Sequence, residues 1–300
     1  MELRHLTYFI AVAEELHFGR AAKRLNISQP PLSQQIKQLE EKLGVRLFNR
    51  TNRRVELTAT GQVFLEEARR IVALSREAVR RAVRADQGEI GHLAVGFIGS
   101  ANYSVLPHII RDFRKKFQDV ELRLTEMNTS HQLEALRDGR IQVGFLRPPR
   151  GMEDEGLSVE PVFREPLVAA MPRNHPLEGE RSLPLRLLSR ESFIMIPRER
   201  GPGFFDFIIA LCHREGFSPR IVLEASQFHT VIGLVAAGVG VAVVPASMQR
   251  SRIEGVVFRT ISGGARTVLD MAWVTDQDSL VLRNFVDVAR KTARSLASRK

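Results

Sequence analysis

The first group of side chains that could carry chemistry lies between residues 28 and 54. Ser33, Gln34 and Lys37 share one side of a predicted helix, and hydroxyl, amide and ammonium groups can contact base edges and phosphates in a DNA groove. Three arginines follow in a predicted hairpin tip. This tip either contacts DNA, at a phosphate or in a minor groove, or is an ordinary solvated turn. We therefore predict DNA contacts by Ser28, Gln29, Pro30, Pro31, Ser33, Gln34, Lys37, Arg50, Arg53 and Arg54.

A second group lies further along the chain. Ser100 and Thr129 each follow a predicted strand and precede a predicted helix, which brings both hydroxyls to the edge of a sheet where α/β folds bind ligands. Helix N-termini favour anions, and Arg147 can add a charge-assisted hydrogen bond, so a carboxylate fits. Phe204 and Phe228 can form apolar walls for a ring. The alternatives are helix caps for the hydroxyls, a solvated loop charge for the arginine and core packing for the two rings.

The sequence contains no recognisable catalytic or metal-binding set. Its eight histidines are scattered, and there is no HExxH motif, no Cys/His cluster with metal spacing and no phosphate-binding glycine loop. The glycines of Gly238-Val239-Gly240 follow a helix and lack a third glycine at dinucleotide spacing. Cys212 is the single cysteine, which excludes an intrachain disulfide. We expect no enzymatic activity, no metal and no cofactor.

Short helices must position the first group. Ala21 and Ala22 let one helix cross another closely, as a helix-turn-helix requires. Ser28 is the predicted N-cap of the next helix, and the two prolines that follow fit its first turn, where their missing N–H groups have no helical partner. The elements predicted from apolar spacing are helices over 3–15, 18–25 and from Ser28 to Gly44, and strands over 45–48 and 55–57. Together they predict a winged helix-turn-helix.

A long helix follows, predicted over 59–87 with Thr58 or Thr60 as its cap. Its apolar stripe is longer than a small winged domain can cover, so we expect it to pair with a second copy of the chain. Such a dimer predicts a DNA site with two-fold symmetry. Residues 86–88 are expected to form a hinge.

From His92 onward, strands alternate with helices. The order strand, helix, strand, helix, strand predicts a parallel sheet with right-handed crossovers. We expect strands over 93–97, 120–126, 141–145, 193–196, 221–225, 241–244 and 267–274, two more within 157–171, and helices over 103–117, 131–138, 204–215, 230–237 and 280–297. The predicted domains are 1–58, winged helix-turn-helix; 59–88, dimerisation helix and hinge; and 89–300, a ligand-binding domain with one subdomain formed by 89–162 and 268–300 and a second formed by 163–267.

Charge and hydropathy limit the partners and the location. Lys and Arg number 44 against 34 Asp and Glu, a formal net charge of +10 that favours a polyanionic partner. The N-terminus does not read as a signal peptide, and the longest apolar run, 233–246, is too short and glycine-rich to cross a bilayer. We expect a cytoplasmic protein without a membrane partner.

A dense motif runs through the first 87 residues, and two further motifs follow at 144–149 and 233–247. The first motif consists of Phe9, Ala21-Ala22, Leu25, Ser28-Gln29-Pro30, Leu32-Ser33, Ile36, Leu39-Glu40, Leu43-Gly44, Leu47-Phe48, Arg50, Leu57-Thr58 and Gly61. The whole chain resembles the LysR-type transcriptional regulators, and most closely those of aromatic degradation that sense benzoate-type acids or muconates. Gln34 departs from the pattern, since many relatives carry Arg there.

The resemblance implies more than the residues alone. It implies two α/β subdomains of the periplasmic-binding-protein type with an effector between them, and a homotetramer of two DNA-binding dimers. It also places Pro202, Gly203 and Phe204 beside Ser100, Thr129 and Arg147 in the effector pocket. Asn102 is a further predicted pocket residue, although Asn102 and Tyr103 depart from the more apolar residues that the resemblance implies there. Two other functions stay open: a solute-binding module of a transport system, and an enzyme fused to a DNA-binding head. The winged N-terminus argues against the first, and the missing catalytic set argues against the second.

Overall fold

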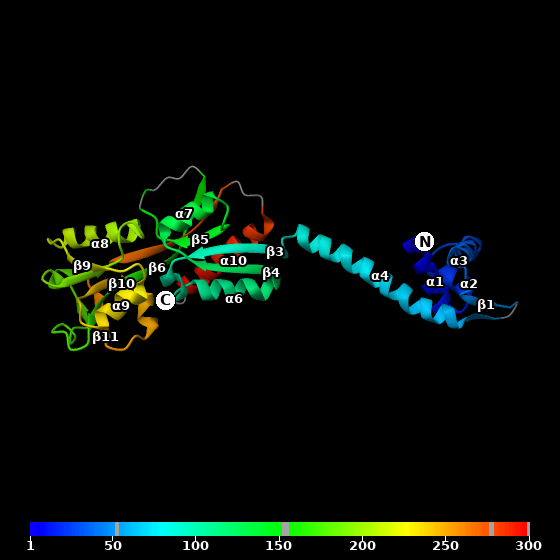
Figure 1. Cartoon of the computed structure of the whole chain (residues 1–300), viewed down its shortest axis with the longest axis horizontal. Helices are drawn as coiled ribbons and strands as arrows, with labels where there is room; N and C mark the ends of the chain where they lie inside the picture. The colour runs from blue at the N-terminus through cyan, green and yellow to red at the C-terminus, as the bar shows by residue number, and fades with distance from the viewer. Residues whose placement is uncertain (52–53, 150, 152–155, 276–278, 299–300) are drawn as a thin grey trace. The chain divides into compact units, whose positions relative to one another are not determined.

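The computed structural model describes residues 1–51, 54–149, 151, 156–275 and 279–298. The chain divides into two compact units, Met1–Arg84 and Ala85–Lys300. Figure 1 labels many of the helices and strands named below. Each unit has its own hydrophobic core, so each is described by itself.

The N-terminal unit is a winged helix-turn-helix, as predicted. Its elements are α1 (Leu3–Glu15), α2 (Phe18–Arg24), α3 (Gln29–Leu43), β1 (Phe48–Arg50), β2 (Val55–Leu57) and the long helix α4 (Ala59–Asp86). Pro30 and Pro31 lie in the first turn of α3, and Gly44 ends that helix with a left-handed φ of 70°. The Thr58 hydroxyl accepts a hydrogen bond from the Gly61 N–H at 2.8 Å, which confirms Thr58 as the cap of α4.

The first strand of the hairpin begins later than predicted, at Phe48 instead of Val45. The reason is the Glu40 carboxylate on α3, which accepts hydrogen bonds from the N–H groups of Leu47 at 2.8 Å and Phe48 at 3.0 Å. The segment before Phe48 is therefore tied to α3 instead of extending the two-stranded ladder.

The C-terminal unit contains a mixed sheet in the order β4-β3-β5-β12-β6-β11-β7, with β10 also paired to β6. The parallel pairs of β3 with β4 and of β3 with β5 confirm the predicted βαβαβ start. The elements are β3 (Ile90–Phe97), α5 (Gly99–Asn102), α6 (Leu106–Lys116), β4 (Asp119–Glu126), α7 (Thr129–Arg137), β5 (Val143–Leu146), β6 (Leu157–Pro172), β7 (Ser182–Leu183), β8 (Ser192–Met195), α8 (Pro202–Arg214), β9 (Arg220–Glu224), α9 (Phe228–Ala236), β10 (Ala242–Pro245), β11 (Val256–Ile261), β12 (Arg266–Val274) and α10 (Leu280–Ala297).

Strands β6 and β12 connect two lobes within this unit. The first lobe has a core from β3, α6, β5 and α10, including Phe113, Phe145 and Phe285. In the second lobe, α8 and α9 cover opposite faces of the strands (Figure 1), with Phe193 and Ile208 in the core beneath α8. The first half of β6 pairs with β12, and its second half pairs with β10 and β11.

Two sequence predictions are wrong in this unit. The helix predicted over 103–117 begins only at Leu106, as α6, and the separate short helix α5 precedes it. Pro107 lies in the first turn of α6, and its ring cannot continue a helix from Tyr103. The two strands predicted within 157–171 are one strand of 16 residues, β6. Pro161 is accommodated inside it by a register shift between Leu269 and Asp270 of the neighbouring strand.

Candidate functional site

Helix α3 presents a polar face and buries an apolar one. Leu32, Ile36 and Leu39 are fully buried in the core of the winged unit. The predicted DNA-contacting residues at positions 28, 29, 30, 31, 34 and 37 are exposed, and Ser33 is partly exposed. The structure therefore gathers the helical part of the predicted set on one accessible surface.

The arginines of the hairpin have different surroundings. The Arg50 guanidinium lies 2.6 Å from the Glu40 carboxylate and 4.9 Å from the centre of the Phe18 ring. Arg54 is mostly exposed and, among the described residues, pairs with Glu56 at 2.8 Å. Arg53 lies outside the described residues. Arg50 is thus held by its own domain, whereas Arg54 extends into solvent.

Two acidic side chains that sequence reasoning missed organise this unit. Glu40 joins α3 to the hairpin through three contacts. Glu14 on α1 receives Arg69 of α4 at 2.7 Å and Arg24 of α2 at 2.8 Å. The hydrogen bond from Arg69, followed by the one from Arg24, lowers the pKa of the Glu14 carboxyl. Their partners are 7 to 55 positions away, so no local spacing rule could find them.

The helix α4 leaves apolar side chains uncovered. Val63 is 67% exposed, Leu74 is 72% exposed, and Ile71 between them is also exposed. Their separations of eight and three residues place them on one side of a helix. A row of exposed apolar side chains along one side of a helix is usual where a second helix packs against it.

The C-terminal unit has a cavity of about 40 Å³ between its two lobes. It lies where helix N-termini converge: Thr129 begins α7, Gly201 precedes α8, and Phe228 begins α9. The lining residues are Ile98, Gly99, Met127, Asn128, Thr129, Arg147, Ile196, Arg200, Gly201, Phe204, Ser226, Gln227 and Phe228. Two of these are arginines and none is acidic, so this cleft is electrostatically suited to an anion.

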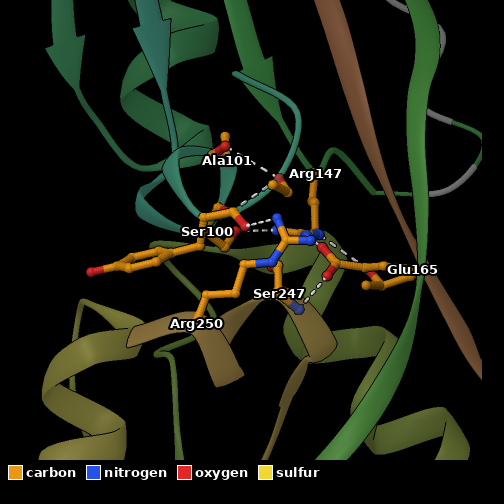
Figure 2. A network of polar contacts seen from close by, with 9 residues as sticks. Ser100, Ala101, Arg147, Glu165, Ser247 and Arg250 are labelled. Carbon is orange, nitrogen blue, oxygen red and sulfur yellow. Dashed lines mark hydrogen bonds and ion pairs between the residues drawn. The ribbon is translucent and has the colours of Figure 1, made fainter. Parts of the chain in front are cut away.

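Arg147 is the buried centre of a polar network beside the cleft (Figure 2). Its guanidinium donates to the Ser100 hydroxyl at 2.6 Å, to the Thr267 hydroxyl at 3.1 Å and to the Glu165 carboxylate at 3.0 Å. Glu165 also accepts the N–H of Ser247 in the second lobe at 2.7 Å. Burial lowers the pKa of Arg147, and Glu165 counteracts this effect; arginine's high ordinary pKa keeps the group charged at neutral pH.

The predicted pocket residues are only partly brought together. Thr129, Arg147, Phe204 and Phe228 line the cleft, and the two rings meet edge to face at 5.1 Å. Ser100 is fully buried behind Arg147 and does not line the cavity. Neither Asn102, which is exposed, nor Pro202 is part of the lining.

Sequence reasoning placed the helix caps at the wrong residues. Asn128, not Thr129, caps α7 by accepting the His131 N–H at 2.9 Å. Asn128 and Gln227 both line the cleft, and each directly precedes a helix. A search for Asn or Gln between a strand and a helix would have found them.

Two hydrogen bonds cross between the lobes near the cleft. The Ser130 hydroxyl donates to the Glu199 carbonyl at 2.8 Å. Arg250 donates to the Tyr103 carbonyl at 3.1 Å. These two bonds hold the two lobes close.

The described part of the chain contains no candidate metal site and no candidate membrane span. There, no three His, Cys, Asp or Glu side chains are grouped so that they could hold a metal ion. No helix in the same residues is long and apolar enough to cross a membrane. Burial raises the pKa of the Cys212 thiol to about 11, so it is protonated at neutral pH.

Comparisons with known proteins cover both units. Residues 3–62 match the family "Bacterial regulatory helix-turn-helix protein, lysR family", and residues 86–294 match the "LysR substrate binding domain". AlsR of Bacillus subtilis is 43% identical over 96% of this chain and 95% of its own, and CatR of Pseudomonas putida is 42% identical over 97% and 99%. Both are named as transcriptional regulators.

Solved structures agree with these matches. The crystal structure of CbnR, a LysR family transcriptional regulator, superposes with a TM-score of 0.88 at 34% identity, covering 97% of this chain and all of that one. Full-length CbnR in complex with its target DNA superposes with a TM-score of 0.83 at 33% identity, covering 98% and 100%.

Proposed function

Because the chain belongs to the LysR family of bacterial DNA-binding transcriptional regulators, we propose that it binds promoter DNA as a homo-oligomer and responds to a small carboxylate in the inter-lobe cleft. The family assignment does not support the alternative of a solute-binding module of a transport system. The relatives are named as transcriptional regulators and not as enzymes. A cytoplasmic location follows, since a bacterial regulator acts on the chromosome.

The observation that carries the effector proposal is the charge of the cleft. Its lining contains Arg147 and Arg200, the N-terminal ends of α7, α8 and α9, and no acidic side chain. Partial positive charge at each helix N-terminus and the two guanidinium groups all favour a negative ligand. The perpendicular rings of Phe204 and Phe228 supply walls for an aromatic or conjugated acid.

The size of the cleft has a further implication for regulation. A cavity of about 40 Å³ is far smaller than the roughly 300 Å³ at which drug-sized pockets begin. A ring acid must therefore move side chains or separate the lobes when it binds. Separation would break the bond from Ser130 to Glu199, so ligand binding and lobe geometry are coupled.

The DNA and oligomer parts of the proposal rest on the N-terminal unit. The exposed polar face of α3 supports groove contacts by Gln29, Ser33, Gln34 and Lys37. The uncovered Val63 and Leu74 on α4 support pairing with a second copy, and a homotetramer is then a dimer of such pairs.

Calorimetry can test the effector assignment directly. Benzoate and cis,cis-muconate should bind the full chain, and Thr129→Val and Arg200→Gln should weaken that binding at least about tenfold by removing contacts to the carboxylate. Thr230→Val, an exposed change on α9 outside the lining, is the matched control. Unchanged binding in both cleft variants, or no binding of either acid, would reject the carboxylate proposal while leaving DNA binding untouched.

A further inference from the structure

A second cavity of about 240 Å³ lies on the other side of Arg147 and Phe204 from the cleft. Its lining comes from the β5 end, β6, α8 and β12, and consists of Arg147, Pro148, Pro161, Arg164, Gly203, Phe204, Phe207, Thr267, Val268 and Asp270. The volume holds several waters at about 30 Å³ each but falls below the roughly 300 Å³ at which drug-sized pockets begin. A compact organic molecule therefore fits it.

The charged groups of this cavity form an unusual arrangement. Arg147 pairs with Glu165 at 3.0 Å, and the further charged groups of this cavity are Arg164 and Asp270, one positive and one negative. Arg164 lies opposite Val268, and Asp270 is two residues further along the same strand, so both side chains are on the same face of the sheet. Within the described residues, however, neither forms an ion pair within 4.0 Å.

The remaining walls are apolar or rigid. Phe204 and Phe207 on α8 and Val268 on β12 supply apolar surface. A Cβ placed on Gly203 would lie 2.2 Å from the Pro148 carbonyl oxygen, so the first turn of α8 packs directly on the backbone after Arg147. The closely packed backbone of Pro148 and Gly203 therefore bounds the cavity on one side. The opposite charges of Arg164 and Asp270 bound it on another.

We propose that this second cavity binds an apolar L-amino acid as its zwitterion. The ammonium group would pair with Asp270, the carboxylate would pair with Arg164, and the side chain would pack against Phe207 and Val268. A zwitterion satisfies both charges at once, whereas a simple acid or amine leaves one of them unpaired in a partly buried site. The assignment does not depend on what occupies the cleft.

The shared wall predicts that the two sites affect each other. Arg147 and Phe204 line both cavities, so a ligand that displaces the Phe204 ring on one side changes the space on the other. Coupling of this kind is reciprocal for binding free energies. An amino acid in the second cavity would therefore alter the affinity of the cleft for its ligand by the same factor as the cleft ligand alters the amino acid's affinity.

Titration calorimetry on the full chain tests the proposal with L-alanine, L-valine, L-leucine and L-phenylalanine. At least one should bind, and its analogues without the ammonium or without the carboxylate should bind at least about tenfold more weakly. Asp270→Asn should remove the preference for the amino acid over the acid analogue, and Arg164→Gln should remove the preference over the amine analogue. Arg266→Gln, an exposed change on β12 outside this cavity, is the control.

Two results would overturn the proposal: no binding of any of the four amino acids, or binding that both charge variants leave unchanged. Thr129→Val distinguishes the two cavities, because Thr129 lines the cleft and does not line the second cavity. If it abolished amino-acid binding while Arg164→Gln did not, the amino acid would occupy the cleft instead. Arg164 is exposed, so Arg164→Gln is expected to fold like the parent.

Discussion

The Glu40 carboxylate lies 2.6 Å from the Arg50 guanidinium, and this pair joins the helix α3 to the first strand of the hairpin. The same carboxylate accepts the N–H groups of Leu47 and Phe48, and Arg50 also lies over the Phe18 ring. Arg50 therefore stabilises the fold of the winged unit before any DNA is bound. A contact from Arg50 to phosphate would have to compete with Glu40.

Replacing Glu40 should destabilise the winged unit. In Glu40→Ala, the N–H groups of Leu47 and Phe48 lose their acceptor, which we expect to lower the free energy of unfolding by about 1–3 kcal/mol. Urea unfolding measures the change. Glu41→Ala is the control, because Glu41 is 61% exposed and only 3.8 Å from Lys37 in a weak surface pair. Equal effects of the two variants would show that Glu40 has no special role.

Two residues on α3 should affect DNA binding differently. Gln34→Ala should cost about 1–3 kcal/mol on the preferred DNA and relax the preference at one base pair, if Gln34 reads a base edge. Lys37→Ala should weaken binding to all sequences and reduce the salt slope by about one, as expected for a phosphate contact. Fluorescence anisotropy at several salt concentrations, on DNA from upstream of the protein's own gene, measures both. Lys42→Ala, another exposed lysine on the same helix, is the control.

The uncovered side of α4 should be needed for self-association. Leu74→Glu places a charge where we expect the second helix, so the dimer should dissociate in sedimentation velocity experiments. Ala73→Glu adds the same charge at the neighbouring exposed position, which points to a different side of the helix, and should leave the dimer intact. A parent chain that is monomeric, or a dimer that tolerates Leu74→Glu, would contradict this interface.

Removing one member of the buried pair of Arg147 and Glu165 should lower the free energy of unfolding much more than replacing both members. Arg147→Met leaves Glu165 as an unpaired buried charge, which typically costs about 3–5 kcal/mol. Removing both charges in Arg147→Met with Glu165→Met should recover much of this loss. Chemical unfolding of the two variants against the parent tests the expectation. If the double variant were as unstable as the sum of the single ones, the pair would not act as a unit.

Asp270 should make stability depend on pH. Burial raises the pKa of its carboxyl, and Arg147 and Arg164 counteract this only in part. The folded protein thus holds this proton more tightly than the unfolded chain does, and its contribution to stability falls as pH rises above the unfolded pKa of about 3.9. Asp270→Asn should therefore melt at a higher temperature than the parent at pH 7, with a smaller difference near pH 4. A difference that is the same at both values would remove Asp270 as its cause.

Much of the fold could be predicted because local sequence determines it. The prolines at the start of α3, Gly44 at its end and Thr58 at the start of α4 each act on backbone within a few residues. The alternation of strands and helices after residue 92 likewise predicts the parallel part of the sheet. Pro107 also carried a readable signal, since its ring forbids the long helix that apolar spacing suggested.

The candidate site was less predictable because distant contacts form it. Ser100 follows a strand end, as a cleft residue should. Its hydroxyl, however, accepts a hydrogen bond from Arg147, which is 47 residues away in the sequence. Glu165 reaches Ser247 across 82 residues, and nothing in either segment indicates the other. The sequence predicted which strand ends could hold a ligand, but the packing of the two lobes decided which side chains face the cavity.

The way in which the second unit begins has a practical consequence for making hybrid regulators. Gly88 has a φ of 68°, and a Cβ there would lie 2.6 Å from the backbone of Leu280, while Asn284 donates to the carbonyl of Gln87 at 3.0 Å. Gln87 and Gly88 directly follow α4 in the sequence. In the structure, however, they pack against α10 near the C-terminal end of the chain. A DNA-reading head exchanged between relatives should be spliced no later than Arg84–Ala85, so that the recipient keeps its own Gln87, Gly88 and α10 as one set. A splice placed after Gly88 would import a foreign backbone turn against α10.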